Sequence, residues 1–168
     1  LNTAQSTTKQ PCALEHYFMH KLDPATLIVQ MLRQQRINRF YNRDAFHLDF
    51  RHSLLAWMRQ ISNKLGYSAV TYHLGCAILD AVLSSFTVDT EHIKVVCFMA
   101  LHLAAKLHES EAKVLDVEHI RELFKNGFKS ADIVNCEKMI CEALSYTLNI
   151  KTHYNFLQLL LQTADCVS

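Results

Sequence analysis

The stretch Val95-Val-Cys-Phe-Met-Ala-Leu-His-Leu-Ala-Ala105 decides the fold. It is uncharged and almost wholly apolar, and it lies inside a predicted helix over residues 91–109. A helix without a polar face has to be surrounded by other elements. The stretch is also too short to cross a bilayer core of about 30 Å. It therefore predicts the central, buried helix of a folded domain, and no membrane association.

Apolar residues recur at three- and four-residue steps on both sides of this stretch, which is typical of amphipathic helices. Asp23-Pro24, Ser68, Asp116 and Ser130 are suited to begin helices, and Gly66 to end one. With only 3 Gly and 2 Pro, the chain has too few turn residues for a β-sandwich or barrel. We expect an all-α fold with helices over 24–40, 49–65, 69–84, 91–109, 116–124 and 130–144, a flexible leader over 1–22, and the start of a further helix at 154–161.

Charge and cysteine usage narrow the class of protein. The net charge is +1, and the densest basic stretch (Arg33, Arg36, Arg39 and Arg43) has the helical spacing of a solvated face, so we expect no nucleic-acid partner. None of the six Cys residues forms a C-x-x-C pair, and Cys76 and Cys97 lie in apolar runs. This pattern is typical of reduced, buried thiols in an intracellular protein of the nucleus or cytoplasm.

No pattern of catalysis or metal binding stands out. His16 and His20 lie four residues apart, but no third ligand follows at zinc spacing. The chain has no Gly-rich phosphate loop and no G-x-S-x-G elbow. We therefore expect no catalytic residue, no metal and no cofactor.

Four segments, in this order over residues 51–148, resemble the signatures of the cyclin box. They are Arg51-His-Ser-Leu-Leu-Ala-Trp57; Thr71-Tyr-His-Leu74 with Ala77-Ile-Leu-Asp80; Leu103-Ala-Ala-Lys106-Leu-His-Glu109; and Cys136-Glu137-Lys-Met-Ile140 with Leu144-Ser-Tyr146-Thr-Leu148. The resemblance implies a five-helix domain around a central buried helix, preceded by an N-terminal helix. It assigns 23–150 to an N-terminal cyclin box and 151–168 to the possible beginning of a second box.

The resemblance also implies a function: a regulatory subunit that binds and activates a cyclin-dependent Ser/Thr protein kinase as a heterodimer. In cyclins, the positions of Lys106 and Glu137 form a pair that holds the kinase backbone where its mobile helix begins. An ordinary surface ion pair is the alternative interpretation. The remaining positions of the implied kinase-binding set are Leu103, Leu107, Glu109, Tyr146 and Leu148, of which Leu103 and Leu148 could equally be core residues.

Two further sets of residues follow from the resemblance. Arg51 and Asp80 match a structural pair that ties the first helix of the box to the second, and we expect this pair to be buried. Phe50, Leu54, Trp57 and Gln60 match the patch at which cell-cycle cyclins dock substrates or inhibitors. Ser53 interrupts its apolar surface and Gln60 lacks a carboxylate, so we expect weak or absent docking of basic-apolar peptides.

Two alternatives to kinase activation stay open. The first is a cyclin-fold scaffold that binds partners without activating a kinase. The departures at Leu107 and His108 from the usual aromatic and acid indicate a divergent member of the family and leave the partner kinase open. The second is a cyclin fold that touches DNA, which would need a basic groove that the balanced charge does not favour.

Overall fold

The structure, a computed structural model, describes residues 24–37, 50–125 and 127–165. Within these ranges the chain is helical and contains no strand, as predicted. Several residues named above lie outside the described residues. They are the leader over 1–22 with Cys12, His16 and His20, and also Asp23, Arg39, Arg43 and Cys166. The helices are α2 (Pro24–Ile37), α3 (Arg51–Lys64), α4 (Ala69–Ser85), α5 (Ile93–His108), α6 (Val117–Leu123), α7 (Ser130–Ala143) and α8 (His153–Asp165), with a short 3-10 turn η2 (Glu111–Lys113) before α6.

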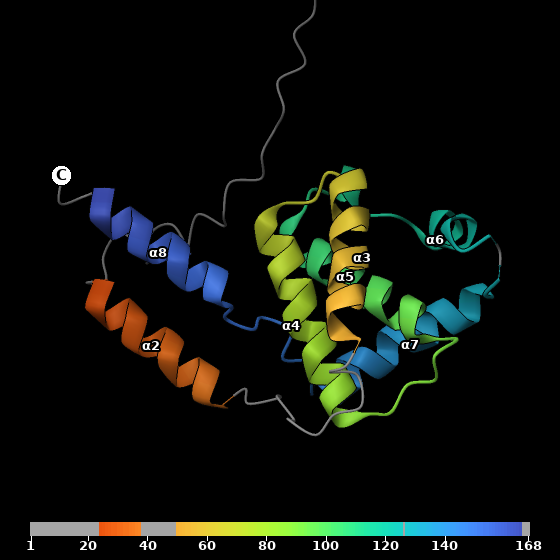
Figure 1. Ribbon diagram of the computed structural model, residues 1–168, viewed down its shortest axis with the longest axis horizontal. Coiled ribbons are helices and arrows are strands. Elements are labelled where there is room, and N and C mark those ends of the chain that lie inside the picture. The colour runs from red at the N-terminus through yellow and green to blue at the C-terminus, as the bar shows by residue number, and fades with distance from the viewer. Residues whose placement is uncertain (1–23, 38–49, 126, 166–168) are drawn as a thin grey trace, which may run out of the picture.

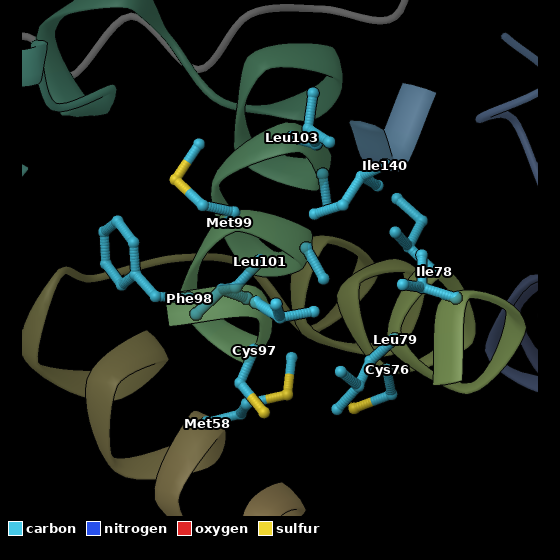
Figure 2. Packing of buried hydrophobic residues seen from close by; sticks show 14 of the residues in the cluster. Met58, Cys76, Ile78, Leu79, Cys97, Phe98, Met99, Leu101, Leu103 and Ile140 are labelled. Carbon is cyan, nitrogen blue, oxygen red and sulfur yellow. The ribbon is translucent and has the colours of Figure 1, made fainter. Parts of the chain in front are cut away.

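Helix α5 is the centre of the core, as the apolar stretch predicts. Every residue from Val95 to Ala105 is buried, and α3, α4 and α7 all pack against this helix. Figure 2 shows how Met58 of α3 and Leu79 of α4 approach the buried side chains of α5. A helix that presents no polar face is stable only in such a setting, because each of its sides is covered by a neighbour.

The contact between α4 and α5 is the most extensive in the fold, and a glycine permits it. A Cβ atom added at Gly75 would lie 3.0 Å from Cα of Leu101. A side chain at this position would therefore require the backbone of α5 to move away by a few tenths of an ångström. Helices α2 and α8 lie side by side, apart from the group formed by α3, α4 and α5, and α8 also contacts α4 (Figure 1).

The predicted helix ends are mostly confirmed. Ser68 accepts a hydrogen bond from the Thr71 N–H, Asp116 accepts one from the His119 N–H, and Gly66 has φ of +65°. The prediction for Ser130 is wrong, because Ser130 is already inside α7. There the Lys129 N–H donates to the Asp132 carboxylate at 3.0 Å, so the third residue of the helix satisfies the cap backbone.

Two observations concern the predictions of reduced, buried thiols and of no membrane association. Cys76 and Cys97 are buried free thiols, and burial raises their pKa values to about 11 and about 12, so both stay protonated at neutral pH. No helix in the described part of the chain is long and apolar enough to cross a membrane.

Candidate functional site

Lys106 and Glu137 form an ion pair between the last turn of α5 and the middle of α7. Lys106 is the first exposed residue after the buried run, and Glu137 lies on the flank of α7 that faces it. The Lys106 Nζ atom donates to Glu137 Oε1 at 2.5 Å, with the two side chains 42% and 27% exposed. An ammonium group has three N–H donors, so the pair can still donate to and accept from a partner's backbone.

His102 lies one turn before Lys106 and is almost fully buried. Its ring stacks on Phe98 with centroids 6.0 Å apart, and its Nδ1 atom has no hydrogen-bond partner among the described residues. Burial, and then the neighbouring Lys106 ammonium, lower the pKa of His102 to about 4. The imidazole is therefore neutral under physiological conditions and adds no charge beneath the ion pair. Sequence reasoning missed this residue, although it is the single polar side chain of the apolar stretch.

The four apolar positions assigned to the site divide into two exposed and two enclosed residues. Leu107 is 50% exposed and Tyr146 is 68% exposed. Leu103 is buried in the core, and Leu148 is half-buried against it, so for these two the alternative interpretation as core residues fits the structure. Leu107 and Tyr146 are thus the residues of this set that a partner could cover.

A tight turn at the end of α7 presents Tyr146. The Tyr146 N–H donates to the Cys141 carbonyl at 2.8 Å and the Ser145 N–H to the Glu142 carbonyl at 2.9 Å, the pattern of a Schellman motif. Glycine usually occupies this motif, yet Ser145 and Tyr146 have φ of 47° and 59°. Left-handed backbone costs about 1–2 kcal/mol for such residues. The turn therefore holds the ring outward at an energetic cost.

The assignment of Glu109 to the kinase-binding surface needs correction. Its side chain is buried and bonded within the molecule: the Ser68 N–H and the Thr71 hydroxyl each donate to Oε1 at 2.6 Å, and Lys113 lies 3.4 Å from Oε2. Burial alone would raise the pKa of Glu109, but these hydrogen bonds and the Lys113 charge outweigh it and hold the pKa below its usual range. Glu109 joins the end of α5 to the beginning of α4.

Arg51 and Asp80 meet as the resemblance implies, but they are not buried. Arg51 Nε donates to Asp80 Oδ1 and Arg51 Nη2 to Oδ2, each at 2.7 Å. The side chains are 35% and 20% exposed, because Arg51 lies at the first turn of α3. This two-bond geometry connects α3 to α4 at a partly solvated position.

The residues matched to a docking patch contribute mainly to packing. Leu54 is buried, and Phe50 and Trp57 are half-buried against the core. Gln60 and Ser53 are exposed. Leu54 is therefore unavailable to a peptide, and the described residues offer little of the apolar surface that such docking needs. Among the same residues, no group of three or more His, Cys, Asp and Glu side chains could hold a metal ion.

Comparison with known proteins agrees with this architecture. The family described as the N-terminal domain of cyclins matches residues 25–149. Mouse cyclin-G2 is 31% identical over 102 residues, which cover 61% of this chain and 30% of the relative. The yeast G2/mitotic-specific cyclin-2 (Saccharomyces cerevisiae) is 26% identical over 148 residues, which cover 88% of this chain and 28% of the relative. Cyclin-D of Ostreococcus tauri is 27% identical over 119 residues, which cover 71% of this chain and 32% of the relative. The chain thus spans about a third of the length of these relatives.

Proposed function

Because the chain belongs to the cyclin family, whose members are regulatory subunits rather than enzymes, we propose that it binds a cyclin-dependent protein kinase and activates it. One observation supports this most: the Lys106–Glu137 pair joins two helices at an exposed position. Exposed Leu107 is the next residue after Lys106 on α5, and exposed Tyr146 follows the end of α7, the helix that carries Glu137. Exposed aromatic and aliphatic side chains are typical anchors of protein–protein contacts, with polar groups at their rim.

The charged and the apolar residues of this surface have different roles, which follow from their chemistry. The Lys106 ammonium satisfies backbone carbonyls at the edge of the kinase's mobile helix, while Glu137 orients the ammonium and accepts a backbone N–H. Leu107 and Tyr146 pack against apolar side chains of that helix and exclude water from the charged contacts. The interface uses neither Glu109 nor Leu103, since both side chains face the interior.

Activation is a shift of population in this proposal. An active kinase needs its strand lysine paired with the glutamate of its mobile helix and its activation loop withdrawn from the cleft. The chain binds that arrangement more tightly than the inactive one, so it raises the active fraction without contributing a reacting group. A scaffold that binds the kinase equally in both states would produce a complex without added activity.

The proposal is tested with purified cyclin-dependent kinases, by affinity capture followed by a phosphotransfer assay on the captured complex. We expect at least one kinase to be captured and activated, and Lys106→Ala and Glu137→Ala each to reduce capture by about tenfold or more. The matched control is the pair Lys138 and Glu142 on α7, whose charged atoms lie 3.7 Å apart at an exposed position. Replacing both control residues by Ala should leave capture unchanged.

Three outcomes would count against the proposal. Capture that survives Lys106→Ala and Glu137→Ala would reject the assigned surface. Capture without activation would support the scaffold instead. Failure to capture any kinase of the panel would reject both.

A further inference from the structure

Glu109 connects the last turn of α5, which carries Lys106, to the beginning of α4. It is the first residue after α5, and its N–H donates to the Ala105 carbonyl at 2.8 Å, which closes the turn that contains Lys106. The side chain of Glu109 is only 6% exposed. Its Oε1 atom accepts hydrogen bonds from the Ser68 N–H and the Thr71 hydroxyl, each at 2.6 Å. The turn that contains Lys106 is therefore bonded to a second helix as well as to its own.

Lys113 engages the second oxygen of the same carboxylate. Its Nζ atom lies 3.4 Å from Glu109 Oε2 and also donates to the Gly66 carbonyl at 2.7 Å, in the turn between α3 and α4. Thr71 is fully buried, so without the carboxylate its hydroxyl would lose a charged acceptor in the interior. Hydrogen bonds to a charged group are about twice as strong as neutral ones. Both oxygens of Glu109 thus fix where the end of α5 lies relative to the turn before α4.

The turn that carries Lys106 has little other support from the core. Residues 95–105 are buried, residues 106–108 are exposed, and Glu109 is buried again. The last four carbonyl groups of a helix have no partner within it, so helix ends fray unless other contacts hold them. A binding group has to be held within about 0.5 Å of its working geometry by contacts of this kind. Glu137 holds the Lys106 ammonium, and Glu109 holds the backbone from which the Lys106 side chain extends.

We propose that Glu109 is a positioning residue of the kinase-binding surface: it sets the backbone at Lys106 so that the ammonium meets the kinase, and it does not touch the kinase itself. This inference rests on the proposed function and deepens it, because it assigns the control of an exposed contact to a buried carboxylate. A Glu109 that contributed to stability alone would change the free energy of unfolding and leave kinase affinity untouched. A positioning residue changes the affinity, and it does so only while Lys106 is present to be positioned.

The experiment measures kinase affinity by calorimetric titration, with a kinase that the wild-type chain captures. We expect Glu109→Ala to weaken the affinity about tenfold, and Glu109→Gln to keep it within about threefold, because the amide oxygen can accept both hydrogen bonds of Oε1. In a chain that already carries Lys106→Ala, the further change Glu109→Ala should weaken the affinity by less than about twofold. This loss of additivity is the readout that a merely structural role would not produce.

Two further variants separate position from stability. Val82→Ala opens a cavity in the core near the opposite end of α4, so it should lower the thermal midpoint and leave kinase affinity unchanged. Thr71→Val removes the hydroxyl donor to Glu109 Oε1 with little change in size, and it should weaken the affinity about threefold. Thr71→Val carries the test if circular dichroism shows that Glu109→Ala does not fold.

The outcomes distinguish this inference from the proposed function. Wild-type affinity in Glu109→Ala, together with a loss in Lys106→Ala, would overturn the positioning role and leave the proposed function intact. A loss in Val82→Ala equal to that in Glu109→Ala would show that overall stability controls binding. Full additivity of Lys106→Ala and Glu109→Ala would show that Glu109 acts independently of Lys106. Unaltered affinity in Lys106→Ala, or no kinase bound by the wild type, would reject the proposed function and this inference with it.

Discussion

At the scale of single residues, His102 is the most unusual member of the core. It places in the centre of an apolar helix, one turn before Lys106, an imidazole whose Nδ1 atom has no hydrogen-bond partner in the part of the chain that the structure describes. An unpaired buried polar atom costs free energy that an apolar side chain of similar size would not. Burial favours the neutral ring there, and a proton on His102 would also bring a second positive charge close to Lys106.

This residue makes stability depend on pH in a defined range. The pKa of His102 is lowered from 6.5 to about 4, so between these values the unfolded chain binds a proton that the folded chain does not. Stability is complete above about pH 6.5 and falls as the pH drops towards 4, by on the order of 3 kcal/mol in total. His102→Leu should raise the thermal midpoint at pH 7 and reduce its decrease between pH 7 and pH 5.

The control variant for this prediction is His52→Gln, which changes an exposed histidine of α3. It should leave the pH dependence as in the wild type. An unaltered decrease in His102→Leu would show that another group with a lowered histidine pKa, such as His73, is responsible for the acid sensitivity in this range.

At the scale of helices, the Arg51–Asp80 contact sets how α3 lies against α4. Its two parallel hydrogen bonds fix both the distance and the orientation of the side chains. Exposed pairs contribute about 0–1 kcal/mol and broken buried pairs cost about 3–5 kcal/mol, and this contact is intermediate in burial. We therefore expect the contact to stabilise the packing of α3 on α4.

A double-mutant cycle with Arg51→Ala and Asp80→Ala measures this contribution. We expect a coupling free energy of about 1–2 kcal/mol in chemical unfolding. The same cycle on Lys138 and Glu142, an exposed 3.7 Å pair within α7, should give only about 0.3–0.5 kcal/mol, since both residues belong to one helix. Equal coupling in the two cycles would contradict a role for Arg51 and Asp80 in joining α3 to α4.

At the scale of the whole molecule, local sequence patterns predicted where the helices lie. They did not predict which residues at the helix ends are buried and which are exposed. The apolar stretch was sufficient to identify α5 as central, because burial on all sides follows from composition alone. Sequence reasoning placed Glu109 on the kinase-binding surface, but its carboxylate is buried against Ser68 and Thr71, since the direction of a side chain at a helix end depends on its partners in another helix. For Leu103 the sequence left a surface and a core position open, and the side chain is buried. The left-handed turn at Ser145 and Tyr146 carries no glycine, so no sequence signal marked it.

The Lys106–Glu137 pair has two interpretations at this scale: a contact that only joins α5 to α7, or a contact that also binds a kinase. An ion pair that merely joins α5 to α7 would tolerate exchange of its two charges, whereas a pair that donates to and accepts from a kinase backbone would not. The two interpretations predict the same stability for the chain with exchanged charges. They differ only in the affinity that they predict for a bound kinase.

The most direct test is therefore the affinity of a captured kinase for the double variant Lys106→Glu with Glu137→Lys, measured by calorimetric titration beside each single variant. We expect the exchange to restore the thermal midpoint lost in the single variants and to leave kinase affinity at least about thirtyfold below the wild type. Recovery of kinase affinity together with stability would contradict the proposal, because the pair would then act only within the chain.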